Sequence, residues 1–215
     1  MSDDARVRAL LAELGYPERD PGEPPTSSAR FADGAQYRVE IPSVEGPDAL
    51  AAVFDEADRR GVVVHRVSSG SGILLSTDAE ITEMVLACAE RGVELSLFVG
   101  PRASWDVGAQ SWAPAGGAQG PRSEGTDQLV AGARDLLRAD ALGVRGALVA
   151  DEGLVLLTRE MKARGLLSPG FVVKGSVQLM ASNPVSARLL QDLGLDTYNV
   201  PPGMSLSRLA GVRAA

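Results

Sequence analysis

The sequence contains a single cysteine, Cys88, and a single histidine, His65. One cysteine excludes an intramolecular disulfide, and it cannot by itself supply a cysteine-rich zinc or iron–sulfur site. Cys88 lies in the helical pattern VLACAERG, so we expect it to be a buried small hydrophobic residue. The residue types present predict no metal site, and they identify no cofactor.

Aromatic residues, excess basic charge and long apolar runs are also scarce. Aromatic residues make up only 4% of the chain, so the core must consist mainly of Leu, Val, Ile and Ala. The net charge of −7 argues against a nucleic-acid partner, because phosphate binding needs an excess of Lys and Arg. No apolar run approaches the roughly 20 residues that cross a bilayer, and the acidic N-terminus does not resemble a signal peptide. We therefore expect a cytoplasmic protein with no membrane partner.

The chain divides into a short N-terminal part and one larger domain. Residues 3–14 have helical spacing of apolar residues and end at Gly15, which predicts a short amphipathic helix. A segment rich in Pro, Gly and Ser follows and predicts an irregular linker. We assign residues 1–34 to this helix and linker, and residues 35–215 to a barrel-like domain.

From Tyr37 onward, short β-branched runs alternate with helical patterns that mostly end in Gly. The six predicted strands lie at residues 37–43, 62–69, 93–100, 144–150, 171–178 and 195–202. Strands alternating with helices of this length imply parallel pairing and right-handed crossovers. The strands show no strict alternation of apolar and polar residues, as expected for a sheet covered on both faces.

Two architectures fit these repeats, a closed barrel and an open doubly wound sheet. The dinucleotide-binding form of the open sheet is disfavoured because no GxGxxG motif follows the first strand. A standard barrel has eight units and about 250 residues. We therefore predict an α/β fold of parallel (β/α) repeats, an incomplete or shortened TIM-type barrel of about six units. A truncated barrel, a piece of a longer protein and an open sheet remain alternatives.

A long insertion near residues 101–125 follows the third predicted strand. It carries Trp105, Trp112, Arg102 and Arg122. In a barrel it would lie at the carboxyl ends of the strands, where barrel active sites are built. A lid over the site and an ordinary loop are both compatible with this pattern.

Polar residues near the predicted carboxyl ends of the strands are the candidates for a site. They are Ser43, Glu45, His65, Arg66, Ser68, Ser69, Arg102, Asp151, Glu152, Lys174, Ser176, Gln178 and Asn199. His65 has the right chemistry for acid–base catalysis, but the chain has no second histidine and no GxSxG motif. Asp151 and Glu152 fit a general base or metal ligand, and they fit equally the start of the next helix.

Lys174, in the strand pattern FVVKGS, offers a different chemistry. A lysine on a barrel strand can form a Schiff base or fix a phosphate or a flavin, and an ordinary strand-end lysine would instead reach solvent. The Gly/Ser loop SSGSG at residues 68–72 has backbone N–H groups that can cradle an anion, but it does not match the P-loop motif.

The C-terminal part, residues 142–213, resembles the collagenase-like peptidase family (peptidase family U-thirty-two). The segments that carry the resemblance are LGVRGALVADEGLVLL, VKGSVQLMASNPVSARLLQDLG and YNVPPGMSLSRLAGVR. It implies a barrel-type fold and peptidase activity, with Ser176, Gln178 and Asn183 matching the family's Ser-x-Gln and Asn positions and Asp151 its turn residue. The cysteine-containing signature of the family is absent, which speaks against the iron–sulfur cluster of some members.

Our first hypothesis is a hydrolase or peptidase-like barrel enzyme that acts on a peptide or small polar substrate. Its catalytic residues would be Asp151, Lys174, Ser176 and Gln178. Its substrate-binding residues would be His65, Arg66, Arg102, Glu152, Asn183 and Asn199. One alternative is a barrel enzyme using a flavin, a phosphate compound or a Schiff base, centred on Lys174. The other is a non-catalytic binding or assembly subunit, and assembly into a homo-oligomer is left open.

Overall fold

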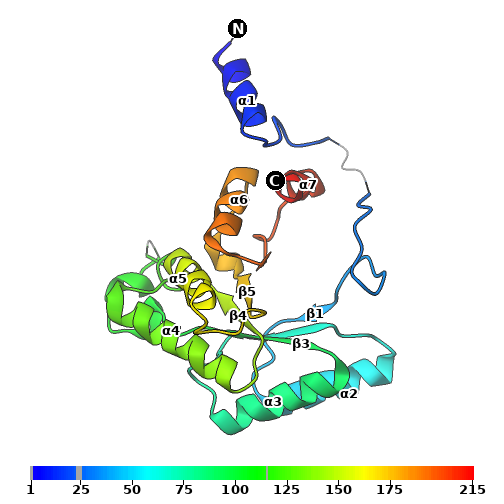
Figure 1. Ribbon diagram of the computed structural model, residues 1–215, viewed down its shortest axis with the longest axis vertical. Coiled ribbons are helices and arrows are strands. Elements are labelled where there is room, and N and C mark those ends of the chain that lie inside the picture. The colour runs from blue at the N-terminus through cyan, green and yellow to red at the C-terminus, as the bar shows by residue number, and fades with distance from the viewer. Residues whose placement is uncertain (1, 23–25, 115) are drawn as a thin grey trace.

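The computed structural model describes residues 2–22, 26–114 and 116–215 (Figure 1). Residues 23–25 of the predicted linker and residue 115 of the insertion lie outside the described residues. The strands are β1 (Glu40–Ile41), β2 (Arg66–Ser69), β3 (Glu94–Phe98), β4 (Gly146–Val149), β5 (Val172–Gly175) and β6 (Thr197–Tyr198). The α-helices are α1 (Asp3–Glu13), α2 (Pro47–Arg60), α3 (Asp78–Arg91), α4 (Gly125–Ala141), α5 (Glu152–Ala163), α6 (Pro184–Leu193) and α7 (Leu206–Ala214). Short 3₁₀ helices span Ala103–Trp105, Ala109–Trp112 and Val177–Leu179.

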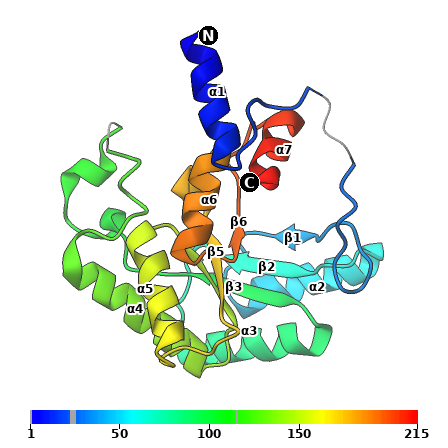
Figure 2. The same ribbon diagram turned by 45° about the horizontal axis from the view of Figure 1, so that its top comes forward.

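The six strands form one parallel sheet in the order β1-β2-β3-β4-β5-β6. Each strand lies beside the next strand in sequence, so the strand order never reverses as it does in a doubly wound sheet. Helices α2 to α6 surround one face of the sheet (Figure 2). The predicted fold class is confirmed: the chain is an incomplete (β/α) barrel.

An ion pair between β1 and β5 shows how strongly the sheet curls. Lys174 on β5 donates a hydrogen bond to the carboxylate of Glu40 on β1. Four steps between strands in a flat sheet would separate these strands by about 19 Å, at about 4.8 Å a step. Two side chains do not bridge such a gap, so the sheet bends until β1 and β5 face each other. The result is a curled half-barrel with a concave face and a helix-covered face.

Local sequence signals set the ends of the helices. Helix α3 begins with a capping box, in which Thr77 and Glu80 bind each other's backbone N–H groups, and ends at Gly92 in the left-handed conformation. Asn183 caps α6 by accepting a hydrogen bond from the backbone N–H of Ser186, at 2.9 Å. These signals explain why the predicted helices appear at the predicted places.

The main hydrophobic core lies between the sheet and its helices. The strands contribute Val67, Leu97, Val149 and Val173, which pack against apolar residues of α2 to α6. Cys88 on α3 belongs to this core, as predicted, and burial raises the pKa of its thiol to about 11. The thiol is therefore protonated and unreactive at neutral pH.

All six strands are shorter than predicted, and β1 and β6 have only two residues each. The run VVVH at residues 62–65 is not strand, and β2 begins only at Arg66. Helix α1 has no buried residue and projects beyond α6 and α7, away from the sheet (Figure 1). Within the described residues, no helix is long and apolar enough to cross a membrane.

Candidate functional site

The concave face of the half-barrel is lined mostly by polar side chains. Paired residues of neighbouring parallel strands share a face, and the residues of one strand alternate between faces. In the strand register, Glu40 lies opposite Arg66, and Arg66 lies opposite Glu94. Ser68 lies opposite Ser96. A second row consists of Phe98, Leu148, Lys174 and Thr197, one from each of β3, β4, β5 and β6. All of these residues lie on the face away from the main core.

Lys174 is the most deeply buried charged side chain on this face. Its side chain is 3% exposed, and that of its partner Glu40 is 23% exposed. The second oxygen of Glu40 accepts a hydrogen bond from the Ser68 hydroxyl, at 3.2 Å. Burying two charges is costly even when they are paired, so this arrangement is weakly justified by stability alone. A buried ion pair in a parallel barrel is a candidate for chemistry.

The chain uses lysine at only two positions, Lys162 and Lys174, among 21 basic residues. Lys162 lies on the helix side, where its ammonium donates to the backbone carbonyl of Phe171 at 2.7 Å. Arginine is always charged, whereas a lysine amine can lose its proton and become a nucleophile. A buried lysine in an arginine-rich chain therefore supplies a chemistry that the other basic residues lack.

Three polar atoms on the concave side are buried without a hydrogen-bond partner in the part of the chain that the structure describes. They are Ser96 Oγ, Thr197 Oγ1 and Glu94 Oε1. The other oxygen of Glu94 accepts a hydrogen bond from Arg66, at 2.9 Å. Buried polar atoms in folded proteins normally have a partner, so these atoms are suited to bind water or the polar groups of a ligand.

A small apolar cluster interrupts the polar surface of the concave face. It consists of Phe98, Leu148 and Ala150, and it is separate from the main core. Leu148 lies between Phe98 and Lys174 in the strand register. The buried amine thus lies beside a hydrophobic floor, a combination typical of small-molecule sites.

The Gly/Ser loop after β2 binds an anion, and that anion belongs to the chain itself. The Glu45 carboxylate accepts hydrogen bonds from the backbone N–H groups of Gly70 at 2.7 Å and Ser71 at 3.0 Å, and from the Ser69 hydroxyl at 2.7 Å. Burial raises the pKa of Glu45, but the hydrogen bonds from Ser69, Ser71 and Gly70 outweigh it, so the pKa lies below its usual value. The N–H groups of this loop do surround an anion, and that anion is the carboxylate of Glu45.

Arg102, which follows β3, lies at the carboxyl edge of the sheet as predicted. Its guanidinium carbon lies over the rings of Phe98 and Trp105, at 4.1 Å and 4.3 Å from their centroids. It donates one hydrogen bond to the Gly70 carbonyl, at 2.9 Å. Trp105 can approach this closely because Gly100 has no side chain, since a Cβ there would lie 2.5 Å from the indole ring.

Several predicted catalytic residues have structural partners instead. Asp151 caps α5 by accepting from the backbone N–H of Leu154 at 2.9 Å, and it also accepts from that of Ser123 at 3.2 Å. Ser176 is buried and caps the 3₁₀ helix that contains Gln178, whose own side chain is exposed. No comparison tests the roles assigned to these residues, which stay predictions.

The predicted substrate-binding residues are scattered. Glu152 forms an ion pair with Arg122 of the insertion, and Asn183 caps α6 on the surface. Asn199 follows β6 directly, as expected, and is half-buried. The structure does not bring these residues together with Lys174 into one contact network.

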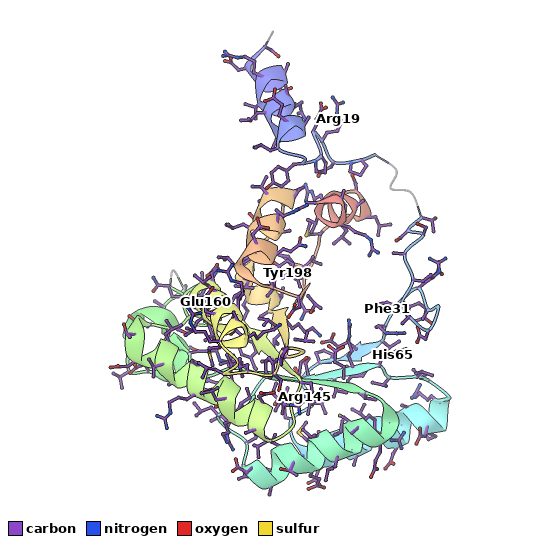
Figure 3. All side chains as sticks on the ribbon, viewed as in Figure 1. Arg19, Phe31, His65, Arg145, Glu160 and Tyr198 are labelled. Atoms are coloured by element: carbon purple, nitrogen blue, oxygen red, sulfur yellow. The ribbon has the colours of Figure 1, made fainter. Side chains whose placement is uncertain are left out.

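The expected position of His65 and Arg66 at the carboxyl end of the second strand was wrong. The strand begins at Arg66, so both residues lie at its amino end, because VVVH does not pair as strand. His65 Nδ1 accepts a hydrogen bond from the backbone N–H of Val39, at 3.0 Å, which ties the chain before β1 to β2. Figure 3 shows His65 and Phe31 on the same side of the molecule, beside β1.

Sequence reasoning missed Glu40, Glu94, Ser96 and Thr197. The signal was present in β3, where Glu94 and Ser96 alternate with Leu95 and Leu97. We expected no alternation because both faces would be covered, whereas the concave face is polar. Within the described residues, no group of three or more His, Cys, Asp or Glu side chains is arranged to hold a metal ion.

Comparisons with known proteins support the fold. No family model matches the chain, and no curated protein matches it. A structure assigned as a deoxyribose-phosphate aldolase from Coccidioides immitis aligns with 99% of this chain and 80% of its own, at 10% identity and a TM-score of 0.51. A structure assigned as a phosphonomutase from Burkholderia cenocepacia aligns with 93% of this chain and 71% of its own, at 17% identity and a TM-score of 0.48.

The tetrameric deoxyribose phosphate aldolase of Aeropyrum pernix aligns with 83% of this chain and 81% of its own, at 13% identity and a TM-score of 0.42. The likeness to the Coccidioides structure concerns the fold alone, and the other two are too weak to carry an argument. The resemblance to collagenase-like peptidases is not tested by these comparisons and stays a prediction.

Proposed function

We propose that the chain is a barrel enzyme in which Lys174 forms a Schiff base with a small carbonyl substrate on the concave face. The observation that carries this proposal is the buried ion pair between Lys174 and Glu40. Lys174 is one of only two lysines in the chain. A strand-borne lysine beside a carboxylate and an apolar floor has the parts that amine catalysis needs. The substrate would reach the amine past Glu40, the more exposed partner.

Glu40 would supply the acid–base steps. It first takes a proton from the Lys174 ammonium, which leaves a neutral amine and a carboxylic acid. The amine nitrogen then attacks the carbonyl carbon, and the carbonyl oxygen receives the proton from Glu40, which gives a carbinolamine. Glu40 then takes a proton from the carbinolamine nitrogen and passes it to the hydroxyl, which leaves as water. An iminium remains on Lys174, with its positive charge beside the regenerated Glu40 carboxylate.

The polar atoms around the pair suit a hydroxylated substrate. Ser68 holds Glu40 in place, and the unpaired hydroxyls of Ser96 and Thr197 lie on the same face. A substrate hydroxyl that meets these atoms would satisfy them, and a substrate lacking it would leave them unpaired. We therefore expect short hydroxyaldehydes or hydroxyketones to bind better than their deoxy analogues.

The peptidase hypothesis has less support from the geometry. Asp151 and Ser176, two of its four catalytic residues, accept hydrogen bonds from backbone N–H groups at helix starts, and Gln178 is exposed. None of the three contacts Lys174 through a hydrogen bond among the described residues. The Lys174 alternative needs only side chains that already share the concave face.

Reductive trapping tests this function. The protein is incubated with glycolaldehyde, dihydroxyacetone or pyruvate and with sodium cyanoborohydride, and its intact mass is then measured. We expect one saturable adduct in the wild type and in Lys162→Arg, and none beyond background in Lys174→Arg. Glu40→Gln should keep the site but slow adduct formation, because the amine loses its proton acceptor. Equal labelling of wild type and Lys174→Arg would refute the proposal.

A further inference from the structure

Arg102 is a partly buried cation. Among residues 2–22, 26–114 and 116–215, no carboxylate lies within 4.0 Å of its guanidinium nitrogens. Its Nε is buried and has no hydrogen-bond partner in the part of the chain that the structure describes. The other arginine of the concave side, Arg66, has such a partner in Glu94, at 2.9 Å. Burial lowers the pKa of Arg102, and the charge of the nearby Glu45 opposes that shift.

Stacking fixes the plane of this guanidinium without using its donors. The guanidinium lies over the rings of both Phe98 and Trp105, and the Gly70 carbonyl accepts from one of its five N–H groups. The remaining donors are the fork that recognises phosphate and carboxylate groups. A cation held in one orientation loses little side-chain entropy when an anion binds.

The position of Arg102 relates it to Lys174. Phe98, on which Arg102 stacks, lies in the same register row as Leu148 and Lys174. Phe98 and Lys174 are two strand steps apart, which is about 10 Å at about 4.8 Å a step. The apolar floor of Phe98, Leu148 and Ala150 lies between the two cations. A short molecule lying on this floor would have the buried amine at one end and the guanidinium at the other.

We propose that Arg102 binds the anionic group of the substrate, so that the substrate class is a short carbonyl compound carrying a phosphate or a carboxylate. This inference rests on the proposed role of Lys174. Both groups are oxyanions that a guanidinium fork binds through two N–H donors. The neighbouring loop N–H groups do not compete for this anion, because Gly70 and Ser71 already bind Glu45. Glu45 also places a negative charge near Arg102, which disfavours a second anion bound to the loop itself.

Trp105 provides a measurement of anion binding that does not involve Lys174. The chain has two tryptophans, and Trp112 is 71% exposed, so Trp112→Phe leaves Trp105 as the single reporter. This variant is titrated with glycerol 3-phosphate, with lactate and with glycerol at constant ionic strength. These probes contain no aldehyde or ketone, so they cannot form a Schiff base. We expect a saturable change in Trp105 fluorescence with at least one of the two anions and none with glycerol.

Variants of Arg102 decide whether this change belongs to the proposed site. Arg102→Gln should weaken the binding at least about tenfold, because a charged hydrogen-bond donor is lost. Arg102→Lys keeps the charge but not the fork, so it should also bind more weakly than the parent protein. Arg122→Gln, in the same insertion, is the matched control and should bind like the parent. Whichever of glycerol 3-phosphate and lactate binds more tightly shows whether the substrate carries a phosphate or a carboxylate.

Two results would overturn the inference: no saturable change with either anion, or equal binding by the parent and both Arg102 variants. Trapping distinguishes this failure from a failure of the proposed function. An adduct on Lys174 together with no anion binding would remove the inference and leave the Schiff-base proposal intact. Anion binding that depends on Arg102, with no adduct on Lys174, would remove the proposed function and keep Arg102 as an anion site.

Discussion

The two faces of the sheet are made by the same short strands, yet they have opposite characters. On β3, Leu95 and Leu97 point to the helices and join the main core, while Glu94 and Ser96 point to the concave side. The helix-covered face is apolar and well packed, and the concave face contains a buried ion pair and unpaired polar atoms. Apolar and polar residues thus alternate along the strand, one kind on each face of the sheet.

The largest expected effect comes from breaking the ion pair of the concave face. Lys174→Met should lower the free energy of unfolding by about 3 kcal/mol, because it leaves the Glu40 carboxylate without its partner. Adding Glu40→Gln should recover most of this loss, since the uncompensated charge is then removed. Urea denaturation of the three proteins measures both effects. A Lys174→Met protein as stable as the wild type would show that the pair is not formed.

On the helix-covered face, a cavity made by truncating a core side chain should lower the free energy of unfolding by a similar amount. We expect no second substitution to restore this loss. Leu97 is fully buried in the main core, so Leu97→Ala should destabilise the protein by about 2–3 kcal/mol. Denaturation in urea again measures the change, and the trapping of carbonyl compounds by the folded protein should be retained. A loss of less than about 0.5 kcal/mol would contradict the packing described for this face.

Asp135 is the exception on the helix side, because it is a buried carboxyl on α4. Burial raises its pKa to about 6, against opposing contributions from the Gly100 N–H group and Arg138. The folded state therefore holds the proton more tightly than the unfolded state, whose pKa is near 3.8. The stabilisation is fully present below pH 3.8 and is lost as the pH rises through about 6.

Asp135→Asn should consequently stabilise the protein at pH 7.5, by up to about 3 kcal/mol for a shift of about two pKa units. Thermal denaturation at pH 5 and pH 7.5 tests this expectation. The gain from the substitution should be larger at pH 7.5 than at pH 5. The same gain at both pH values would mean that Asp135 does not titrate in this range.

The smallest effect on stability is expected at Ser96 on the concave face. Ser96→Ala removes a hydroxyl that has no partner among the described residues, so the free energy of unfolding should change by less than about 0.5 kcal/mol. The trapping of dihydroxyacetone should nevertheless weaken more than the trapping of acetone. A large loss of stability would show that Ser96 has a structural role.

The sequence predicted the fold well because its signals are local. The capping residues Thr77 and Asn183 and the terminal Gly92 mark helix ends wherever they occur. The site was harder to predict because it depends on which face each strand residue takes. Lys174 was identified as a lysine on a barrel strand, whereas its partner Glu40 is 134 residues away in sequence and meets it only through the curl of the sheet.

His65 shows a second limit of prediction. Its position at the amino or carboxyl edge depends on where β2 begins, and the apolar run before it has the composition of a strand without forming one. Asp151 shows a third limit, since a carboxylate before a helix fits both a cap and a general base until its hydrogen bonds are known. In each case the missing information was spatial.

Peptide mapping of the trapped adduct shows which lysine reacts with the carbonyl compound, because it compares the two lysines in one sample. The side chain of Lys162 is 21% exposed and that of Lys174 is 3% exposed, so non-specific labelling would favour Lys162. After treatment with dihydroxyacetone and cyanoborohydride, we expect the adduct on Lys174. An adduct on Lys162, with Lys174 unmodified, would show that Lys174 does not form the Schiff base.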